Sequence, residues 1–253
     1  MDNFTRTHAP AGAMDTSTDA GLRSFMLGVY NKMGLGLALS AGLAYAVGTV
    51  APLTQLVFNT PLLYVVQFGP LVLLFGSMFF MRRPSPLGSA VLYWSIVTLI
   101  GMGLSVWVVI ASQPQGVTTL SGTSINATFS TIAQAFFLTA ASFAAISLWG
   151  YTTKRNLTGM GTFLFMGVFG VVALGLVNAF LVQSSGFELL IQLAVLVLMA
   201  GVVAWQTQTL KVSYYQMAGD QRSLAVMTNM GALNLYIAFV NIFQILMSFL
   251  GRE

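Results

Sequence analysis

Charged residues are scarce in this sequence. Ten Lys or Arg and six Asp or Glu occur among 253 residues, which is 6% of the chain, whereas about 25% is usual in soluble proteins. Hydrophobic residues make up 57%, and the mean hydropathy is +0.83. So little charge cannot cover a soluble fold with hydrated side chains. The composition therefore predicts an integral membrane protein whose main surroundings are the lipid bilayer.

Cysteine is absent, and histidine occurs once, as His8. The lack of cysteine excludes disulfides, thiolate metal sites and cysteine nucleophiles. Serine-type intramembrane proteolysis needs a histidine base beside the serine, and His8 lies in a polar N-terminal tail. These absences remove most hydrolase and metalloenzyme chemistry.

Acidic residues are absent from the hydrophobic segments, apart from Glu188 at the end of one of them. All aspartates lie in the tail or in a loop: Asp2, Asp15, Asp19 and Asp220. Intramembrane aspartyl proteolysis needs two carboxylates within the bilayer. A retinal Schiff base needs a lysine in the last hydrophobic segment, and residues 224–250 contain none. We therefore predict no enzyme, no catalytic residue, no cofactor and no metal site.

The N-terminal region divides into two parts. Residues 1–18 are polar and predict a disordered cytoplasmic tail. Residues 19–32 predict an amphipathic interfacial helix, with Asp19 as its N-cap and with Arg23 and Lys32 reaching lipid phosphates. Its apolar residues recur at the spacing of one helix face: Leu22, Phe25, Met26, Val29 and Tyr30.

The rest of the chain, residues 33–253, predicts a domain of seven transmembrane helices. About 20 apolar residues are needed to cross a bilayer. The segments that meet this length are 33–51, 61–81, 87–111, 127–150, 159–182, 187–206 and 224–250. The breaks between them contain proline, glycine, serine or charged residues. The sequence thus predicts an all-α polytopic membrane protein.

The basic residues predict the orientation of these helices. With the N-terminus in the cytoplasm, nine of the ten basic residues lie inside and only Arg252 lies outside, as the positive-inside rule requires. The residues in the loops that set this topology are Arg82, Arg83, Lys154, Arg155, Lys211 and Arg222. No basic run exceeds two residues, so we expect no nucleic-acid partner.

Small residues form two four-residue-spaced ridges in the first span. One ridge is Gly34, Ala38, Gly42 and Ala46, and the other is Gly36, Ser40, Ala44 and Gly48. Such ridges let helix backbones approach closely. Packing within one bundle is favoured over a dimer interface.

Glu188 is the acidic residue nearest to a span. Ser185-x-x-Glu188 has the spacing of a capping box at the start of the sixth span, and a negative charge suits a helix N-terminus. The alternative is that Glu188 attracts cations at an outer mouth.

The remaining polarity within the spans is mostly amide. Asn234 and Asn241 are seven residues apart and share one face of the last helix, with Ala238 between them. Such a polar stripe should face protein or water rather than lipid, which predicts that this helix lies near the bundle centre. Bridging between helices is favoured as the role of these amides, and a permeation or ligand site is the alternative.

Several motifs resemble the Bax inhibitor-1 family, also called the transmembrane Bax-inhibitor-motif family, and its bacterial branch in particular. The most characteristic stretch is SLWGYTTKRNLTGMG, residues 147–161. Residues 205–208, WQTQ, stand where the family commonly has YDTQ, and residues 235–241, LYIAFVN, resemble LYLDFIN. The resemblance implies six helices around a central seventh.

The resemblance also implies a pH-sensitive calcium leak that an aspartate pair controls. Gln206 and Ala238 occupy the two aspartate positions. Gln206 cannot titrate, and Ala238 can neither titrate nor coordinate a cation. We therefore expect the fold without the gated leak, so that calcium is a doubtful ligand.

Two functions remain. The favoured one is a regulatory or accessory partner of a bacterial inner-membrane complex, such as the membrane protease to which the resemblance links some relatives. The alternative is a cation leak or small-solute transporter that uses the amides as an uncharged pathway.

Overall fold

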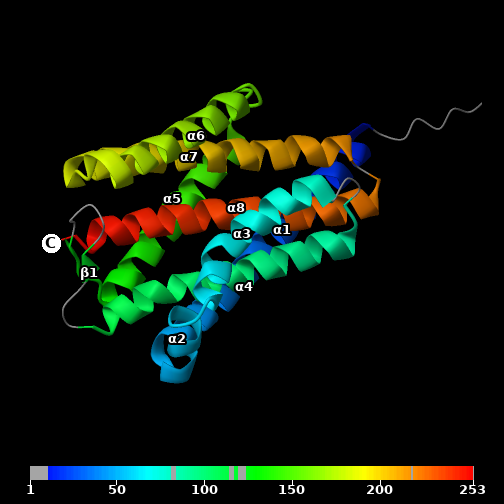
Figure 1. Cartoon of the computed structure of the whole chain (residues 1–253). Coiled ribbons are helices and arrows are strands. Elements are labelled where there is room, and N and C mark those ends of the chain that lie inside the picture. Colours follow the sequence, from blue (N-terminus) through cyan, green and yellow to red (C-terminus); the bar gives the residue numbers. More distant parts are fainter. Residues whose placement is uncertain (1–10, 81–83, 114–116, 119–123, 218, 253) are drawn as a thin grey trace, which may run out of the picture.

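The structure is a computed structural model that describes residues 11–80, 84–113, 117–118, 124–217 and 219–252, without the side chains of 11–19, 80, 117 and 118. Helices make up almost all of it (Figure 1). They are α1 (Ala11–Thr49), α2 (Ala51–Phe58), α3 (Leu62–Phe80), α4 (Pro86–Ala111), α5 (Phe129–Thr152), α6 (Met160–Val177), the π-helical turn η1 (Asn178–Val182), α7 (Ser185–Gln216) and α8 (Gln221–Leu250). Two short antiparallel strands, β1 (Val117–Thr118) and β2 (Ser124–Ile125), connect α4 to α5.

The predicted polytopic α-helical fold is confirmed. Six helices within the described residues are each long and apolar enough to cross a membrane. A seventh span results when α1 and α2, which meet at a bend of 97°, are taken together. Proline at the start of α2 suits a first helical turn after such a break. Within the described residues, the N-terminal and C-terminal ends lie at opposite ends of the bundle, as an odd number of crossings requires (Figure 1).

The last helix, α8, lies at the centre of the bundle, as predicted. In an apolar 18-residue window of α8, 61% of the residues are buried, against 6% in the corresponding window of α3. Helices α1, α4, α5 and α7 contact α8 directly, while α3 packs mainly on α4 and α6 mainly on α7. Thus α6 and α7 lie on one side of α8 and α3 and α4 on the other (Figure 1).

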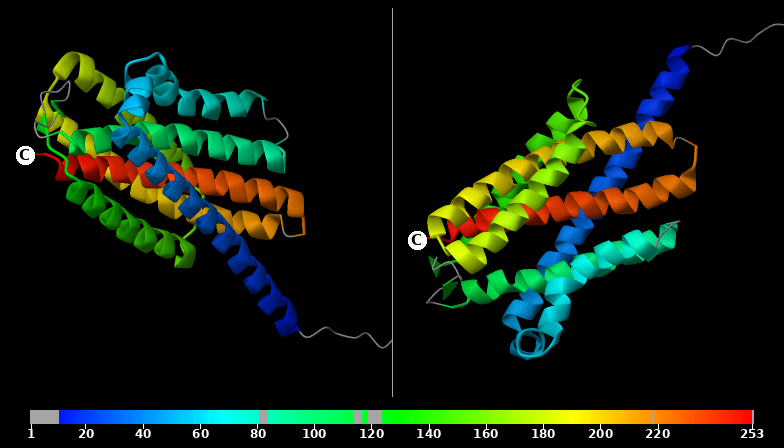
Figure 2. Two further views of the ribbon diagram at one scale, coloured as in Figure 1. Left: turned by 90° about the horizontal axis from the view of Figure 1, so that it is seen from below. Right: turned by 45° about the horizontal axis from the view of Figure 1, so that its top comes forward.

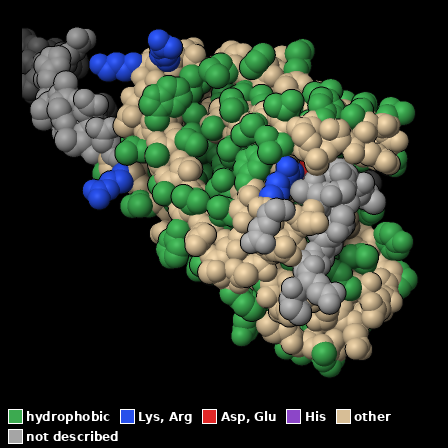
Figure 3. All heavy atoms as spheres, turned by 90° about the vertical axis from the view of Figure 1, so that its left-hand side faces the viewer, with side chains coloured by type: hydrophobic (Ala, Val, Ile, Leu, Met, Phe, Trp, Pro, Cys, Tyr) green, Lys and Arg blue, Asp and Glu red, His purple; other side chains and the backbone are tan. Residues whose placement is uncertain are grey.

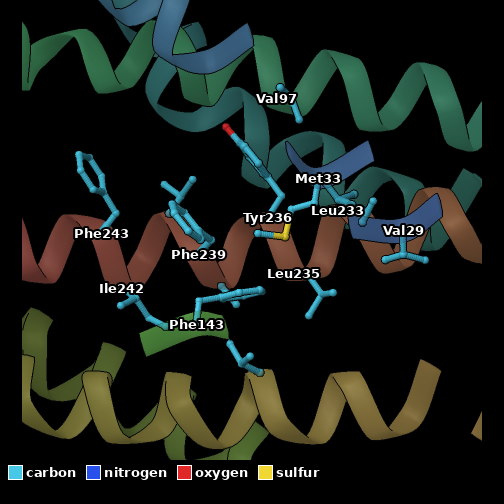
Figure 4. Close-up of a cluster of buried hydrophobic side chains, with 14 of the residues drawn as sticks. Val29, Met33, Val97, Phe143, Leu233, Leu235, Tyr236, Phe239, Ile242 and Phe243 are labelled. Atoms are coloured by element: carbon cyan, nitrogen blue, oxygen red, sulfur yellow. The ribbon is translucent and has the colours of Figure 1, made fainter. Parts of the chain in front are cut away.

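Side chains on all sides of α8 form the core. Tyr236 and Phe243 project towards the side on which Val97 of α4 lies, whereas Leu235 and Ile242 project towards the opposite side (Figure 4). The Tyr236 hydroxyl is within 2.6 Å of Ser40 Oγ, which donates to the Val97 carbonyl at 3.2 Å. A helix that is buried all round must satisfy its polar groups internally, and this chain of hydrogen bonds does so.

One of the two small-residue ridges forms the contact between α1 and α4. Ser40 and Ala44 are 1% and 7% exposed. A Cβ atom added to Gly48 would lie 2.6 Å from the Val108 side chain, and one added to Gly101 of α4 would lie 2.7 Å from the Ser40 backbone. The other ridge, which contains Gly34 and Gly42, has open space at both glycines. Close packing within the bundle is therefore the role of the ridge that contains Ser40, Ala44 and Gly48.

The N-terminal prediction needs correction. Residues 19–32 continue into the first span without a break, as parts of the 39-residue helix α1. Leu22, Phe25 and Val29 are buried in the core, because α1 crosses the bundle obliquely and turns its apolar face towards the other helices (Figure 2). Residues 11–18 are helical as well, and only residues 1–10 of the predicted tail lie outside the described part.

Helix α7 is longer than predicted. It extends to Gln216, so Lys211 belongs to the helix and not to the following loop. Its 32 residues correspond to about 48 Å at 1.5 Å per residue, against a hydrocarbon core of about 30 Å. The hydrophobic pattern stops near residue 206, but helical structure continues because the polar residues that follow contact neighbouring segments.

Candidate functional site between helices α6, α7 and α8

The four polar-centre positions singled out in the sequence lie together. Gln206 of α7 and Asn234, Ala238 and Asn241 of α8 line a single cavity of about 150 Å³, which Leu164, Phe165 and Val168 of α6 close on the third side. Ala238 is buried at 2% exposure. The four-residue and seven-residue spacings on α8 place its three residues on one helix face, and this face points towards Gln206.

A larger cavity of about 440 Å³ shares Trp205, Gln206 and Asn234 with the first one. It lies between α7 and α8, and its wall includes Thr209 and Ser213 of α7. Arg222 and Ser223, at the start of α8, also line it. The two cavities adjoin at these three residues, and their linings extend from the α7–α8 connection to Asn241, in the second half of α8.

Two buried polar atoms face this region without a hydrogen-bond partner among the described residues. They are the side-chain oxygen Oε1 of Gln206 and the indole nitrogen Nε1 of Trp205. One is an acceptor and the other a donor. An unpaired buried polar group costs about 1–3 kcal/mol, so such a pair suits water or a small polar solute that both donates and accepts.

The indole of Trp205 is held tightly in place. A Cβ atom added to Gly161 of α6 would lie 2.7 Å from Trp205 Cζ2. Phe165 makes an edge-to-face contact with the same indole, with ring centroids 5.8 Å apart. Sequence reasoning did not single out Trp205 as a site residue, although it is the first residue of the WQTQ segment.

The described lining of both cavities contains no Asp or Glu side chain. Its polar groups are amides, hydroxyls, the Trp205 indole and the Arg222 guanidinium. Asp220, just outside, accepts hydrogen bonds from the backbone nitrogen atoms of Arg222 and Ser223 and caps α8. Hydrogen bonds from the Ser223 side chain and backbone lower the pKa of Asp220 below its ordinary value. Apart from the Arg222 guanidinium in the larger cavity, the site therefore offers only neutral hydrogen-bonding groups.

Other amides bridge helices. Asn229 of α8 donates from Nδ2 to the Pro86 carbonyl at 3.0 Å and to Ser89 Oγ at 2.8 Å, and it accepts from Lys32. Lys32 also lies over the Tyr93 ring, 5.6 Å from its centroid. Lys32 thus reaches the bundle interior and not the lipid phosphates expected for it, because Asn229 offers a buried acceptor.

Glu188 has a different role from the predicted capping box. Ser184, not Ser185, is the N-cap of α7, and its Oγ accepts from the Phe187 nitrogen at 3.4 Å. Glu188 Oε1 accepts from Arg252 at 2.9 Å and from Gln192 at 3.0 Å. Arg252 in the C-terminal segment therefore compensates the charge of Glu188. This ion pair lies at the opposite end of the bundle from Asp220.

The C-terminal segment closes this end of the bundle. The Asn126 nitrogen donates to the Gly251 carbonyl at 2.7 Å, and Ile125 forms a β-bridge with Arg252. The face at this end consists mostly of hydrophobic and uncharged side chains (Figure 3).

Four of the six topology-setting residues can be placed. Lys154 and Arg155 are exposed after α5, and Arg222 is exposed in the first turn of α8. Lys211 donates to the Tyr151 carbonyl at 3.2 Å, which joins the C-terminal parts of α5 and α7. Arg82 and Arg83 lie outside the described residues.

Comparison with known proteins identifies the relatives of this chain. Residues 22–253 match the family described as "Inhibitor of apoptosis-promoting Bax1". An uncharacterized protein of Caulobacter vibrioides is 44% identical, over 99% of this chain and 98% of that protein. A Rickettsia prowazekii protein is 36% identical over 100% and 99% of the two chains. The inner membrane protein YbhL of Escherichia coli is 31% identical over the full length of both.

Proposed function

Because the chain belongs to the Bax inhibitor-1 family, we propose that it is a non-enzymatic regulatory or accessory partner of a membrane protein complex and has lost a proton-gated calcium leak. The proposed loss of the leak rests on one observation: Gln206 and Ala238 line the same cavity, and its described lining has no carboxylate. The name of the E. coli relative supports a place in the bacterial inner membrane.

The chemistry of calcium explains the proposed loss. Ca²⁺ takes about six to eight oxygen ligands, among which carboxylates supply the compensating charge. The cavity offers the amide oxygens of Gln206, Asn234 and Asn241, which carry no net charge. Two neighbouring carboxylates share a proton near neutral pH and so respond to pH, whereas an amide and a methyl group do not titrate.

A flux measurement tests the loss of the leak. Purified protein is placed in liposomes, and calcium entry is followed between about pH 6 and 8, where a coupled carboxylate pair titrates. We expect little flux and a flat pH profile for the wild type. The double variant Gln206→Asp with Ala238→Asp should gain flux that depends on pH, because it restores two interacting carboxylates.

The single variants Gln206→Asp and Ala238→Asp are the matched controls, since each adds one carboxylate without a coupled partner. A steep pH-dependent calcium flux in the wild type would contradict the proposal.

The partner role is tested by purification of the full-length protein in a mild detergent. We expect a stable complex with another membrane protein to co-purify. If the partner is a membrane protease that engages the N-terminal end of the chain, deletion of residues 1–18 should abolish the effect on its turnover, because chain ends are where proteolysis concentrates. An unchanged effect after this deletion would argue against the protease version, and migration as a free protein would argue against both.

A second candidate, passage of a small neutral solute, is favoured by the two adjoining cavities, whose linings extend from the α7–α8 connection to Asn241. Unpaired Gln206 Oε1 and Trp205 Nε1 could each bind one polar atom of the solute. Uptake of glycerol or urea by proteoliposomes, measured through light scattering, should fall in Gln206→Leu and Asn234→Leu. The control is Gln134→Leu, on the exposed side of α5 and outside both cavities.

A further inference from the structure

A groove of about 820 Å³ runs between α1 and α5, away from the cavities described above. Its floor includes Phe239 of the central helix α8, which α1 crosses obliquely (Figure 2). The groove opens sideways, because Leu27 and Leu148 on its edges are 51% and 64% exposed. Its volume lies within the range of about 300–1,000 Å³ that small-molecule sites occupy.

The lining of the groove changes character along its length. Arg23 of α1 and Tyr151 of α5 line one end, and Met33, Ala140 and Phe143 line the other. Ten residues of helix separate Arg23 from Met33, which is about 15 Å at 1.5 Å per residue. This is half of the hydrocarbon thickness of about 30 Å. Because α1 is oblique, the groove is less deep than this and fits within one leaflet, with its charge at the membrane surface and its apolar part towards the midplane.

Polar groups lie between the charged and the apolar ends. The Tyr30 hydroxyl hydrogen-bonds to Ser147 Oγ, which is 3.1 Å from Thr207 Oγ1 of α7. Tyr30 and Ser147 both line the groove. This hydrogen bond joins α1 to α5 and offers hydroxyl groups at the depth where the glycerol and ester oxygens of a phospholipid would lie.

The charged end of the groove is positive. Arg23 is exposed, and no Asp or Glu is among the described residues that line the groove. Lys211 lies over the Tyr151 ring, 4.8 Å from its centroid, and adds a second positive charge beside this end. The acidic side chains that the structure describes, Glu188 and Asp220, are engaged with Arg252 and with the first turn of α8.

We propose that this groove binds one anionic phospholipid, with the phosphate at Arg23 and an acyl chain along Met33, Ala140 and Phe143. Basic pockets between transmembrane helices attract anionic head groups in this way. An acyl chain suits the apolar end, because this part is open to the bilayer and is lined by aliphatic and aromatic side chains. The inference is independent of the proposed function, since the groove shares no lining residue with the cavities beside Gln206.

Native mass spectrometry of the full-length protein tests the proposal, with dioleoyl phosphatidylglycerol and dioleoyl phosphatidylcholine as probes. The wild type should retain one phosphatidylglycerol in preference to phosphatidylcholine. Arg23→Gln should weaken phosphatidylglycerol binding about fivefold, which corresponds to about 1 kcal/mol per basic residue. Lys154→Gln is the matched control, because Lys154 is also basic and exposed but does not line the groove; it should leave binding unchanged.

A second variant tests the apolar part. Ala144 lines the groove and is exposed, so Ala144→Trp should fill the groove and reduce binding of both lipids, with a smaller reduction for Ala144→Leu. Equal losses in Arg23→Gln and Lys154→Gln would indicate non-specific attraction and overturn the proposal, as would full binding in Ala144→Trp. A protein dimer that Ala144→Trp abolishes, without any effect on lipid, would assign the groove to a second copy of the chain and overturn it as well.

Discussion

Single glycines decide how closely the helices approach. A Cβ atom added to Gly150 of α5 would lie 2.5 Å from the Ala204 carbonyl oxygen and 2.8 Å from Ala204 Cα on α7. These are backbone atoms, so a side-chain rotation cannot relieve the clash. The absence of a side chain at Gly150 is therefore what allows α5 and α7 to touch at this point.

We predict that Gly150→Ala destabilises the protein by about 1–3 kcal/mol, the usual cost of overpacking. The measurement is the thermal unfolding midpoint in detergent. The control is Gly170→Ala in α6, where an added Cβ atom would meet open space. That change should be neutral or stabilising by up to about 1 kcal/mol, because alanine favours helix. Equal midpoints for the two variants would contradict this account of the α5–α7 contact.

The sequence motifs predicted some residues of the candidate site but not others. The motif alignment predicted which positions of α7 and α8 would meet, and the structure places Gln206 and Ala238 in one cavity. The alignment did not predict the unpaired Trp205 nitrogen, because a tryptophan at a span end is equally typical of the membrane interface.

Among the elements, α8 depends on its N-cap. Asp220 begins this 30-residue helix and accepts hydrogen bonds from Arg222 and Ser223. Folding lowers the pKa of Asp220. Its contribution to stability is therefore fully present above the ordinary aspartate pKa of about 4, and it is lost as the pH falls through the lower pKa of the folded state.

We predict that wild type and Asp220→Asn differ in unfolding midpoint by a constant amount at neutral pH and that the difference shrinks below about pH 4. Asparagine also caps helices but does not titrate. Asp220→Ala, which removes the cap, should be less stable than both at neutral pH. If the difference in unfolding midpoint between wild type and Asp220→Asn stays the same down to the lowest pH, the titration of Asp220 is not its cause.

For the whole molecule, the charge distribution predicts which end faces the cytoplasm. Lys154 and Arg155, after α5, and Arg222, in the first turn of α8, lie at one end of the bundle, and the C-terminal segment with Arg252 closes the other. The chain contains no cysteine, so an introduced cysteine reports on one position alone.

We predict that Gln113→Cys, in the connection after α4, reacts with a membrane-impermeant maleimide in intact cells and that Lys154→Cys reacts only after the membrane is opened. Both residues are exposed in the structure, so a difference in labelling reports the side of the membrane. The opposite pattern would reverse the proposed orientation with the N-terminus in the cytoplasm.

The amino-acid sequence was enough to predict the class of fold and the central place of the last helix, and six of its seven predicted spans correspond to single helices of the structure. These follow from segment length and from polarity, which are local properties that each stretch of chain carries wherever it packs. The tertiary structure decided the rest: the continuous α1, the ridge of α1 that meets α4, the partner of Glu188, and the groove beside Arg23. Each of these depends on which residues distant in the chain become neighbours. Close packing between helices selects those neighbours. The hydrophobic pattern cannot select them, because the helices are apolar on several faces and the pattern does not show which face meets which helix.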